Sequence, residues 1–165
     1  MKTVRGSIWK LSGPLDYVVI PTTIGWRKDG TAIMQTGLAR QAATRYEDLE
    51  LWYGDRCLRA GPSTGVLIHR PRAAASRNLI LFPVKPVKEV TPQMSWDQPA
   101  CLALIERSAK ELEVMISQGA ISANRWVFVP PVGCEQNGRL QEEAVLPVLE
   151  KHLGRFEHVR LVHPR

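Results

Sequence analysis

Short β-rich apolar runs alternate along the chain with longer segments in which apolar positions recur at helical spacing. The runs at residues 17–20 and 79–82 are apolar throughout, which is typical of strands that a sheet buries on both faces. Four further β-rich runs are predicted to be strands, at residues 7–11, 66–69, 126–129 and 158–162. Strands that alternate with helices in this way predict a layered α/β fold.

The clearest predicted helix covers residues 100–117, where apolar side chains form one stripe and Pro99 and Gly119 supply start and stop signals. Residues 141–152 place acidic side chains first and basic side chains last, which suits the helix dipole. Pro147 lies inside this segment, so we expect an irregular or late first turn there. The other predicted helices are residues 32–45 and 48–57.

The length of 165 residues predicts one domain over residues 1–165. No apolar run in the sequence approaches the roughly 20 residues that span a bilayer, so we expect no membrane association. We also expect a cytoplasmic, monomeric protein. The three cysteines are far apart and show no CxxC spacing, which predicts neither a disulfide framework nor a metal site.

The formal net charge is +6, and the excess of Lys and Arg over Asp and Glu falls in residues 1–85. A basic half favours a polyanionic ligand or a nucleic acid through long-range attraction. The candidate residues for such a contact are Arg56, Arg59, Arg70, Arg72 and Arg77. Because they are not interleaved with aromatic residues, a solvated surface is the alternative interpretation.

Two loops that follow the buried strands contain unusual residues, and ligand sites in open α/β sheets lie beyond the carboxyl ends of the central strands. Residues 21–37 combine Thr22 and Thr23 with glycines that lead into a helix, where free N–H groups attract phosphate. Lys85 stands between two prolines at a strand end. It could neutralise phosphate, act as a nucleophilic amine if its pKa is lowered, or simply re-enter solvent.

The loop at residues 130–140 is the most informative, because an apolar strand gives way to Gly133-Cys134, then to Asn137-Gly138, then to a helix. A turn of this kind can present successive N–H groups to an anion. Neither the GxGxxG nor the GxxxxGK[ST] motif is present. The sequence therefore favours a nucleotide-diphosphate site that is built from two loops of a kind other than these two motifs.

These motifs resemble those of the macrodomain family, and within it the branch of terminal ADP-ribose glycohydrolases and of antitoxins that reverse DNA ADP-ribosylation. Residues 130–135 look like its Pro-small-Gly-Cys-Gly loop, and residues 34–39 resemble its Met-Gly-x-Gly-[Ile/Leu]-Ala loop. Residues 79–85 are similar to the strand that ends in a catalytic lysine. The early Gly-Asp-Ile strand is similar to Gly6-Ser7-Ile8, and a Tyr and a Cys of the family are similar to Tyr53 and Cys57.

The resemblance implies a three-layer α/β/α fold with a mixed, mostly parallel sheet of about six strands, and ADP-ribose as ligand without a cofactor or metal. It implies catalytic roles for Lys85 and Asn137. The ligand-binding residues that it implies are Ser7, Ile8, Thr22, Thr23, Gly37, Leu38, Ala39, Val132, Gly133, Cys134, Glu135, Gln136, Asn137, Gly138, Arg139 and Leu140.

Several positions depart from the family pattern. Ser7 stands where the family has the aspartate that pairs with the adenine amino group, and Gln35 and Glu135 each replace a glycine that faces phosphate. Asn137 or Gly138 falls nearest to the acidic residue that assists the lysine in the glycohydrolases. Two functions follow: hydrolysis of ADP-ribosyl linkages on nucleic acid or protein, or non-catalytic reading of ADP-ribose or a related NAD-derived nucleotide.

Overall fold

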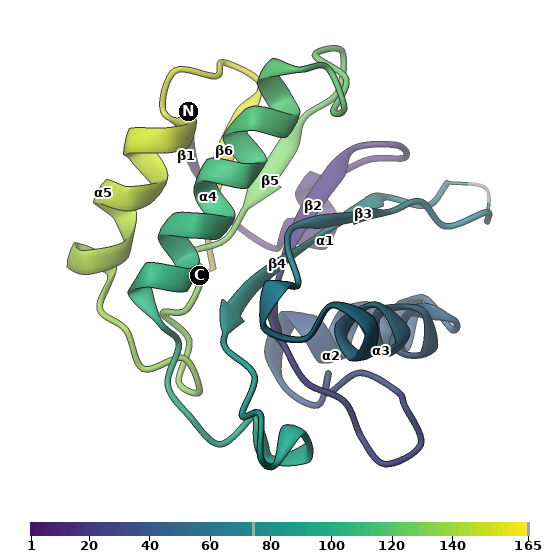
Figure 1. Cartoon of the computed structure of the whole chain (residues 1–165). Coiled ribbons are helices and arrows are strands. Elements are labelled where there is room, and N and C mark those ends of the chain that lie inside the picture. Colours follow the sequence, from purple (N-terminus) through teal and green to yellow (C-terminus); the bar gives the residue numbers. More distant parts are fainter. Residues whose placement is uncertain (74, 165) are drawn as a thin grey trace.

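The computed structural model describes residues 1–73 and 75–164, and its centre is a six-stranded sheet in the order β1-β6-β5-β2-β4-β3 (Figure 1). The strands are β1 (Lys2–Arg5), β2 (Tyr17–Thr23), β3 (Leu67–His69), β4 (Asn78–Lys85), β5 (Val127–Val129) and β6 (Val159–His163). Neighbouring strands are parallel except β3, which pairs antiparallel with β4.

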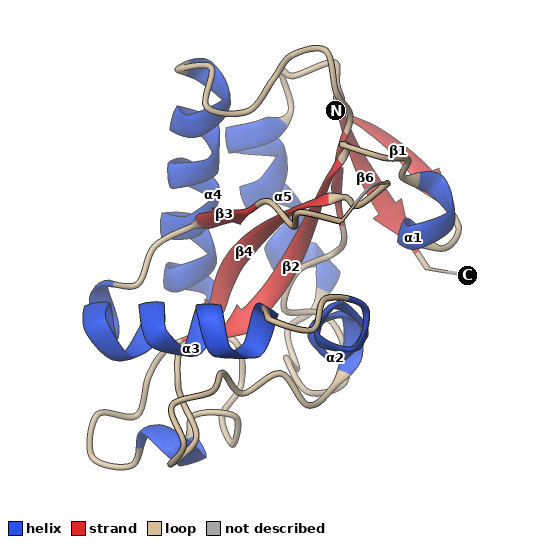
Figure 2. Ribbon diagram, turned by 90° about the vertical axis from the view of Figure 1, so that its right-hand side faces the viewer, coloured by secondary structure: helices blue, strands red, loops and turns tan. Residues whose placement is uncertain are grey.

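Helices cover both faces of this sheet. They are α1 (Ile8–Leu11), α2 (Gly37–Arg45), α3 (Leu49–Ala60), α4 (Leu102–Ser117) and α5 (Glu142–Leu153), with the short 3-10 turns η1 (Gly61–Ser63) and η2 (Pro92–Met94). Figure 1 shows α4 and α5 on one side of the sheet and α2 and α3 on the other. Figure 2 shows β2 and β4 running in the same direction, with α1 beside β1 and β6.

Alternate residues of the buried strands separate the two halves of the core. Val19 and Ile80 pack with α4 and α5, whereas Val18 and Leu79 pack with α1, α2 and α3. This is the behaviour of a strand whose successive side chains point to opposite faces. The predicted three-layer α/β/α fold with a mixed, mostly parallel sheet is therefore confirmed.

The strand predicted at residues 7–11 is wrong, since Ile8 to Leu11 form α1, and Gly6-Ser7-Ile8 lie in the turn and the helix that follow β1. Gly6 has a φ of +138°, which ends the extended backbone, and the Ser7 carbonyl accepts from the Lys10 and Leu11 amides. The strand β1 was missed because it is a short edge strand whose side chains are mostly exposed, so it carries no apolar run.

The predicted helix at residues 32–45 begins only at Gly37. The Ala32 amide donates to the Glu50 carbonyl, and Ala32 forms an isolated antiparallel bridge with Trp26. The buried side chains of this extended stretch produced the helix-like apolar pattern. In α5, Pro147 lies within a continuous helix, and the first turn is irregular only in that the Ala144 amide bonds the Gln141 carbonyl three residues back.

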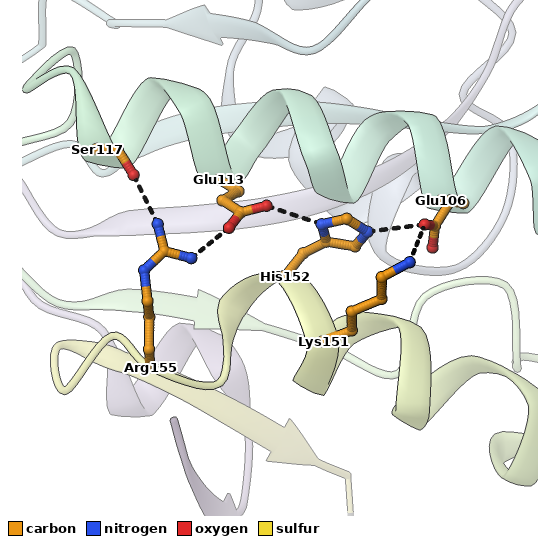
Figure 3. Close-up of polar contacts among 6 residues, drawn as sticks. All are labelled: Glu106, Glu113, Ser117, Lys151, His152 and Arg155. Atoms are coloured by element: carbon orange, nitrogen blue, oxygen red, sulfur yellow. Dashed lines mark hydrogen bonds and ion pairs between the residues drawn. The ribbon is translucent and has the colours of Figure 1, made fainter.

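A polar cluster joins α4 to α5 (Figure 3). The His152 ring lies between two carboxylates, with Nδ1 2.8 Å from Glu113 and Nε2 2.9 Å from Glu106. Burial opposes protonation, but these hydrogen bonds outweigh it and raise the pKa of His152. Lys151 and Arg155 add further bonds to the same two glutamates.

Candidate functional site

A cavity of about 530 Å³ lies at the carboxyl ends of the parallel strands, within the roughly 300–1,000 Å³ typical of small-molecule sites. Residues at the ends of β1, β6, β5, β2 and β4 all line it. Neighbouring strands are about 4.8 Å apart, so the cavity extends for roughly 19 Å from β1 to β4. Its elongated form suits an extended ligand.

Most of the predicted site residues meet at this cavity, although their sequence positions are far apart. Those that line it are Ser7, Ile8, Thr22, Thr23, Gly37, Leu38, Ala39, Lys85, Cys134, Glu135, Asn137 and Arg139. Those that do not are Val132, Gly133, Gln136, Gly138 and Leu140. Among the first group, the role of each in ligand binding stays a prediction.

The N-terminus of α2 contributes one set of backbone donors. The first bond within this helix runs from the Arg40 amide to the Thr36 carbonyl. In the part of the chain that the structure describes, the amides of Gly37, Leu38 and Ala39 therefore have no acceptor. Free amides at a helix N-terminus, together with the helix dipole, form a ready site for an anion.

The loop after β5 contributes a second set. The Gly138 and Arg139 amides donate to the Glu135 carbonyl, and the Leu140 amide donates to the Gly133 carbonyl. The amides of residues 135–137 have no acceptor within residues 1–73 and 75–164. Three successive free N–H groups in a turn attract an anion.

Two glycines hold this loop in shape instead of facing the cavity. Gly133 has a φ of +75°, and a Cβ there would lie 2.8 Å from Cδ1 of Ile105. A Cβ on Gly138 would lie 2.6 Å from the Gly133 carbonyl carbon, so the two glycine backbones are in contact. We assign Gly138 to the packing of the loop, because its amide already has an acceptor.

Lys85 is the last residue of β4, and its exposed fraction is only 6%. The alternative in which it re-enters solvent is therefore wrong. Its Nζ donates to the Trp96 carbonyl at 2.9 Å. Burial lowers the pKa of Lys85, Glu135 partly offsets this, and Arg139 adds to it. A buried amine with a lowered pKa has a larger neutral, nucleophilic fraction than an ordinary surface lysine.

Thr22, which lines the cavity, is bonded to a buried tyrosine. Thr22 is 2% exposed, and its hydroxyl lies 2.7 Å from that of Tyr53. Burial raises the pKa of Tyr53 well above its usual value and that of Cys57 to about 11. Cys134 lines the cavity, but burial and then Glu142 raise its pKa to about 11. None of these groups is suited to act as an anionic nucleophile.

Comparisons with known proteins identify the fold that carries this cavity. No protein-family model matches the chain, and no curated protein matches it either. The macrodomain of Mycobacterium tuberculosis DarG is similar to it with a TM-score of 0.75 at 22% identity, over 99% of this chain and 95% of that one. The chain has the macrodomain fold.

Two further solved structures share the macrodomain fold. The macrodomain of Thermus aquaticus DarG is similar with a TM-score of 0.73 at 23% identity, over 99% of this chain and 97% of that one. Thermosipho africanus DarTG, in complex with ADP-ribose, is similar with a TM-score of 0.70 at 16% identity, over 92% of this chain and 38% of that one. The resemblance found in the sequence is thereby confirmed for the fold.

Within the macrodomain fold, the cavity also contains residues that sequence reasoning missed. Trp9 lies there and donates its indole N–H to Gln41 Oε1 at 2.8 Å, and Gln41 lines the cavity as well. Gln41 is one helical turn beyond Gly37, so its spacing could have revealed it. Trp96 is a third addition, whereas Trp26, in the loop before α2, packs against the core and does not line the cavity.

The arginines proposed for nucleic-acid binding do not line the cavity. Arg56 and Arg59 pair with Asp55. Arg70 bonds the Ala120 carbonyl, and Arg77 bonds the backbone of the segment that follows α1. These contacts favour the interpretation as surface and structural residues. None of the described helices is long and apolar enough to cross a membrane, and no cluster of His, Cys, Asp and Glu among the described residues has metal-site geometry.

Proposed function

We propose that this chain binds ADP-ribose in the cavity and hydrolyses ADP-ribosyl linkages with Lys85. The observation that carries the proposal is the pair of free amide sets, at residues 37–39 and 135–137, on two segments of one elongated cavity that all of these residues except Gln136 line. Together they offer donors for a diphosphate without any lysine or metal. ADP-ribose has its charge in the middle and a sugar on either side, which is the distribution that this cavity suits.

The two ends of the cavity differ in chemistry, and this gives the ligand a direction. At the β1 and β6 end, Ile8, Trp9 and Val162 provide apolar walls for the adenine base. At the β4 end, Lys85 lies where the distal ribose would be held. The similarity to DarTG in complex with ADP-ribose supports the same ligand.

Lys85 supplies the chemistry in this proposal. Its neutral amine attacks C1″ of the distal ribose, and the bond between C1″ and the linked group breaks, with its electron pair leaving on that group. Water then replaces the amine at C1″ and releases ADP-ribose and the free lysine. Asn137 lines the same cavity and is a candidate to orient that water through its side-chain amide.

A non-catalytic reader of ADP-ribose is the second candidate. The observation that favours it is the environment of Lys85, whose only hydrogen bond within the described residues goes to a backbone carbonyl. No described carboxylate is within hydrogen-bond distance of its Nζ to accept or return a proton.

The test compares wild type with Lys85→Ala on ADP-ribosylated nucleic acid and on ADP-ribosylated protein. Lys88→Ala is the matched control, since Lys88 lies three residues on and does not line the cavity. We expect Lys85→Ala to lower the rate by about 100-fold or more and to keep its affinity for ADP-ribose in calorimetric titration. Equal rates for both proteins would contradict the catalytic role, and tight binding without any turnover by wild type would favour the reader.

A further inference from the structure

The amino ends of β1, β6 and β5 carry an arginine stacked on an exposed tryptophan. Trp126, which immediately precedes β5, is 45% exposed, and the guanidinium carbon of Arg160 lies 4.2 Å from the centroid of its ring. Lys2 is the register partner of Arg160 across β1 and β6, so these two residues are neighbours in the sheet. Arg125 is exposed and adjoins Trp126 in the chain. We call these four residues the amino-end patch.

The amino-end patch lies apart from the cavity, towards the other ends of the same strands. None of its residues lines the cavity. Pro130 does, and it is four residues beyond Trp126, which corresponds to about 13 Å of extended chain. Figure 2 shows the start of β1 well away from α2 and α3. A ligand on the patch would therefore be held independently of a ligand in the cavity.

The cations of the patch are available to a ligand. No ion pair among residues 1–73 and 75–164 involves Lys2, Arg125 or Arg160. Arg160 bonds the carbonyls of Glu157 and Val159 through Nη1. These bonds fix the plane of the guanidinium over the Trp126 ring and leave Nε and Nη2 as donors.

This edge of the sheet has an excess of positive charge. The segments that form it, residues 1–5, 124–129 and 157–163, contain four Lys and Arg residues and one acidic residue, Glu157. The N-terminal ammonium adds a further charge. Burial lowers the pKa of His158, and Arg160 and the N-terminal ammonium lower it further. Such a concentration of cations attracts a polyanion.

We propose that the amino-end patch binds single-stranded nucleic acid, with a base stacked on the Trp126 ring and phosphates held by the three cations around it. The inference goes beyond the function proposed above and does not rest on it. Basic side chains combined with an aromatic ring suit a single strand, because every base offers a face for stacking and the backbone tracks the cations. Arg160 takes one face of the ring, so the base stacks on the other.

Two other partners of a basic surface fit the amino-end patch less well. A protein interface is centred on a larger apolar area, whereas the described contacts join a single exposed ring to the cations. A contact with a membrane surface buries the apolar face of a helix, and this edge consists of strand ends. A duplex would meet the cations, but its bases are already stacked and cannot use the Trp126 ring.

The experiment uses the full chain and a fluorescently labelled oligothymidylate of about 20 nucleotides, longer than the roughly 4–16 that one site of this kind covers. Anisotropy gives the affinity for it and for a duplex of the same length, and co-sedimentation tests vesicles of phosphatidylserine and phosphatidylcholine. Trp126→Leu removes the ring, and Trp126→Phe keeps one. Lys2→Gln and Arg160→Gln each remove a charge. The matched control is Lys110→Gln, because Lys110 is exposed on α4, away from the patch.

We expect wild type to bind the oligothymidylate at about 50 mM salt and to bind the duplex about tenfold more weakly. Trp126→Leu should weaken binding to the single strand by about tenfold, and Trp126→Phe by less than about threefold. Lys110→Gln should bind as wild type does. Each phosphate contact on a single strand contributes about 0.7 to the slope of log K against log salt, so Lys2→Gln and Arg160→Gln together should lower that slope by about 1.4.

Failure of wild type to bind the oligothymidylate would overturn the proposal. Equal affinities of wild type and Trp126→Leu, equal losses in Arg160→Gln and Lys110→Gln, or a duplex bound as tightly as the single strand would overturn it as well. So would binding to the vesicles without binding to the oligothymidylate. ADP-ribose is titrated separately, and its failure to bind would overturn the proposed function while leaving this surface in place.

Discussion

Replacing Gly138 with alanine should distort the loop after β5 and weaken ADP-ribose binding, although Gly138 does not touch the cavity. Its φ lies outside the left-handed region, so alanine meets no backbone penalty there. The new methyl group would instead lie 2.6 Å from the Gly133 carbonyl carbon and 2.9 Å from its Cα. Backbone atoms cannot rotate away as a side chain does, so the two segments must separate.

The loss of stability comes from this overpacking and from the hydrogen bonds that the separation weakens. Overpacking of this kind costs about 1–3 kcal/mol. Two hydrogen bonds anchor the glycines, from the Ala100 amide to the Gly138 carbonyl and from the Leu140 amide to the Gly133 carbonyl. Each contributes about 0.5–1.5 kcal/mol. A loss of about 3 kcal/mol corresponds to a fall in Tm of about 6–12 °C for a chain of this size.

Calorimetric scanning would give the Tm, and titration with ADP-ribose the affinity, which we expect to fall at least about tenfold as the amides of residues 135–137 move. Gly119→Ala is the control: Gly119 has a φ of +80° and open space around it. That change costs about 1–2 kcal/mol through backbone strain and should leave the affinity intact. If Gly138→Ala were within about 0.5 kcal/mol of wild type and bound ADP-ribose equally well, the packing role of Gly138 would be refuted.

Three further outcomes are expected. Glu135→Gln should tighten ADP-ribose binding by about twofold to tenfold at low ionic strength, with a smaller gain at high salt; weaker binding on titration would show that the carboxylate assists the ligand. Thr22→Val should lower the free energy of unfolding by about 1–3 kcal/mol because it removes the hydroxyl that the buried Tyr53 hydroxyl bonds, whereas adding Tyr53→Phe should restore most of the loss in urea unfolding. Since the folded state raises the pKa of His152, that stabilisation is present in full below the unfolded pKa of about 6.5 and is lost as pH rises through the folded value; a His152→Gln variant whose stability fell in parallel with wild type over this range would contradict the assignment.

The helices and strands could be predicted from the sequence wherever their buried residues form an apolar run or recur at helical spacing. The strands β2 and β4 are apolar runs, and α4 has a clear stripe. The edge strand β1 shows no such pattern, because most of its side chains are exposed and its backbone pairs with β6 alone among the described strands. The misplaced start of α2 has a related cause: the buried extended residues before Gly37 look like one face of a helix in the sequence alone.

Some residues of the candidate site could likewise be predicted from the sequence, and others could not. Lys85 and the glycine loops could be predicted because the end of an apolar strand and the glycines of a loop are visible in the sequence. Trp9 and Trp96 could not, because their positions depend on how α1 and the segment after β4 pack around the cavity. Gly138 shows the reverse, since it resembles a phosphate-binding glycine and in fact packs against Gly133.

The pairing of β1 with β6 also builds one end of the cavity from the two ends of the chain. Thr3 pairs with Leu161, so this contact closes almost the longest loop that the chain allows. The entropy lost in such closure grows only slowly with loop length, and contacts of high sequence separation slow folding. A chain in which β1 were not paired with β6 would still carry Lys85 and both amide sets on its other strands and loops. It would lack the walls for the base, because Ile8 and Val162 come from the two segments that would not meet.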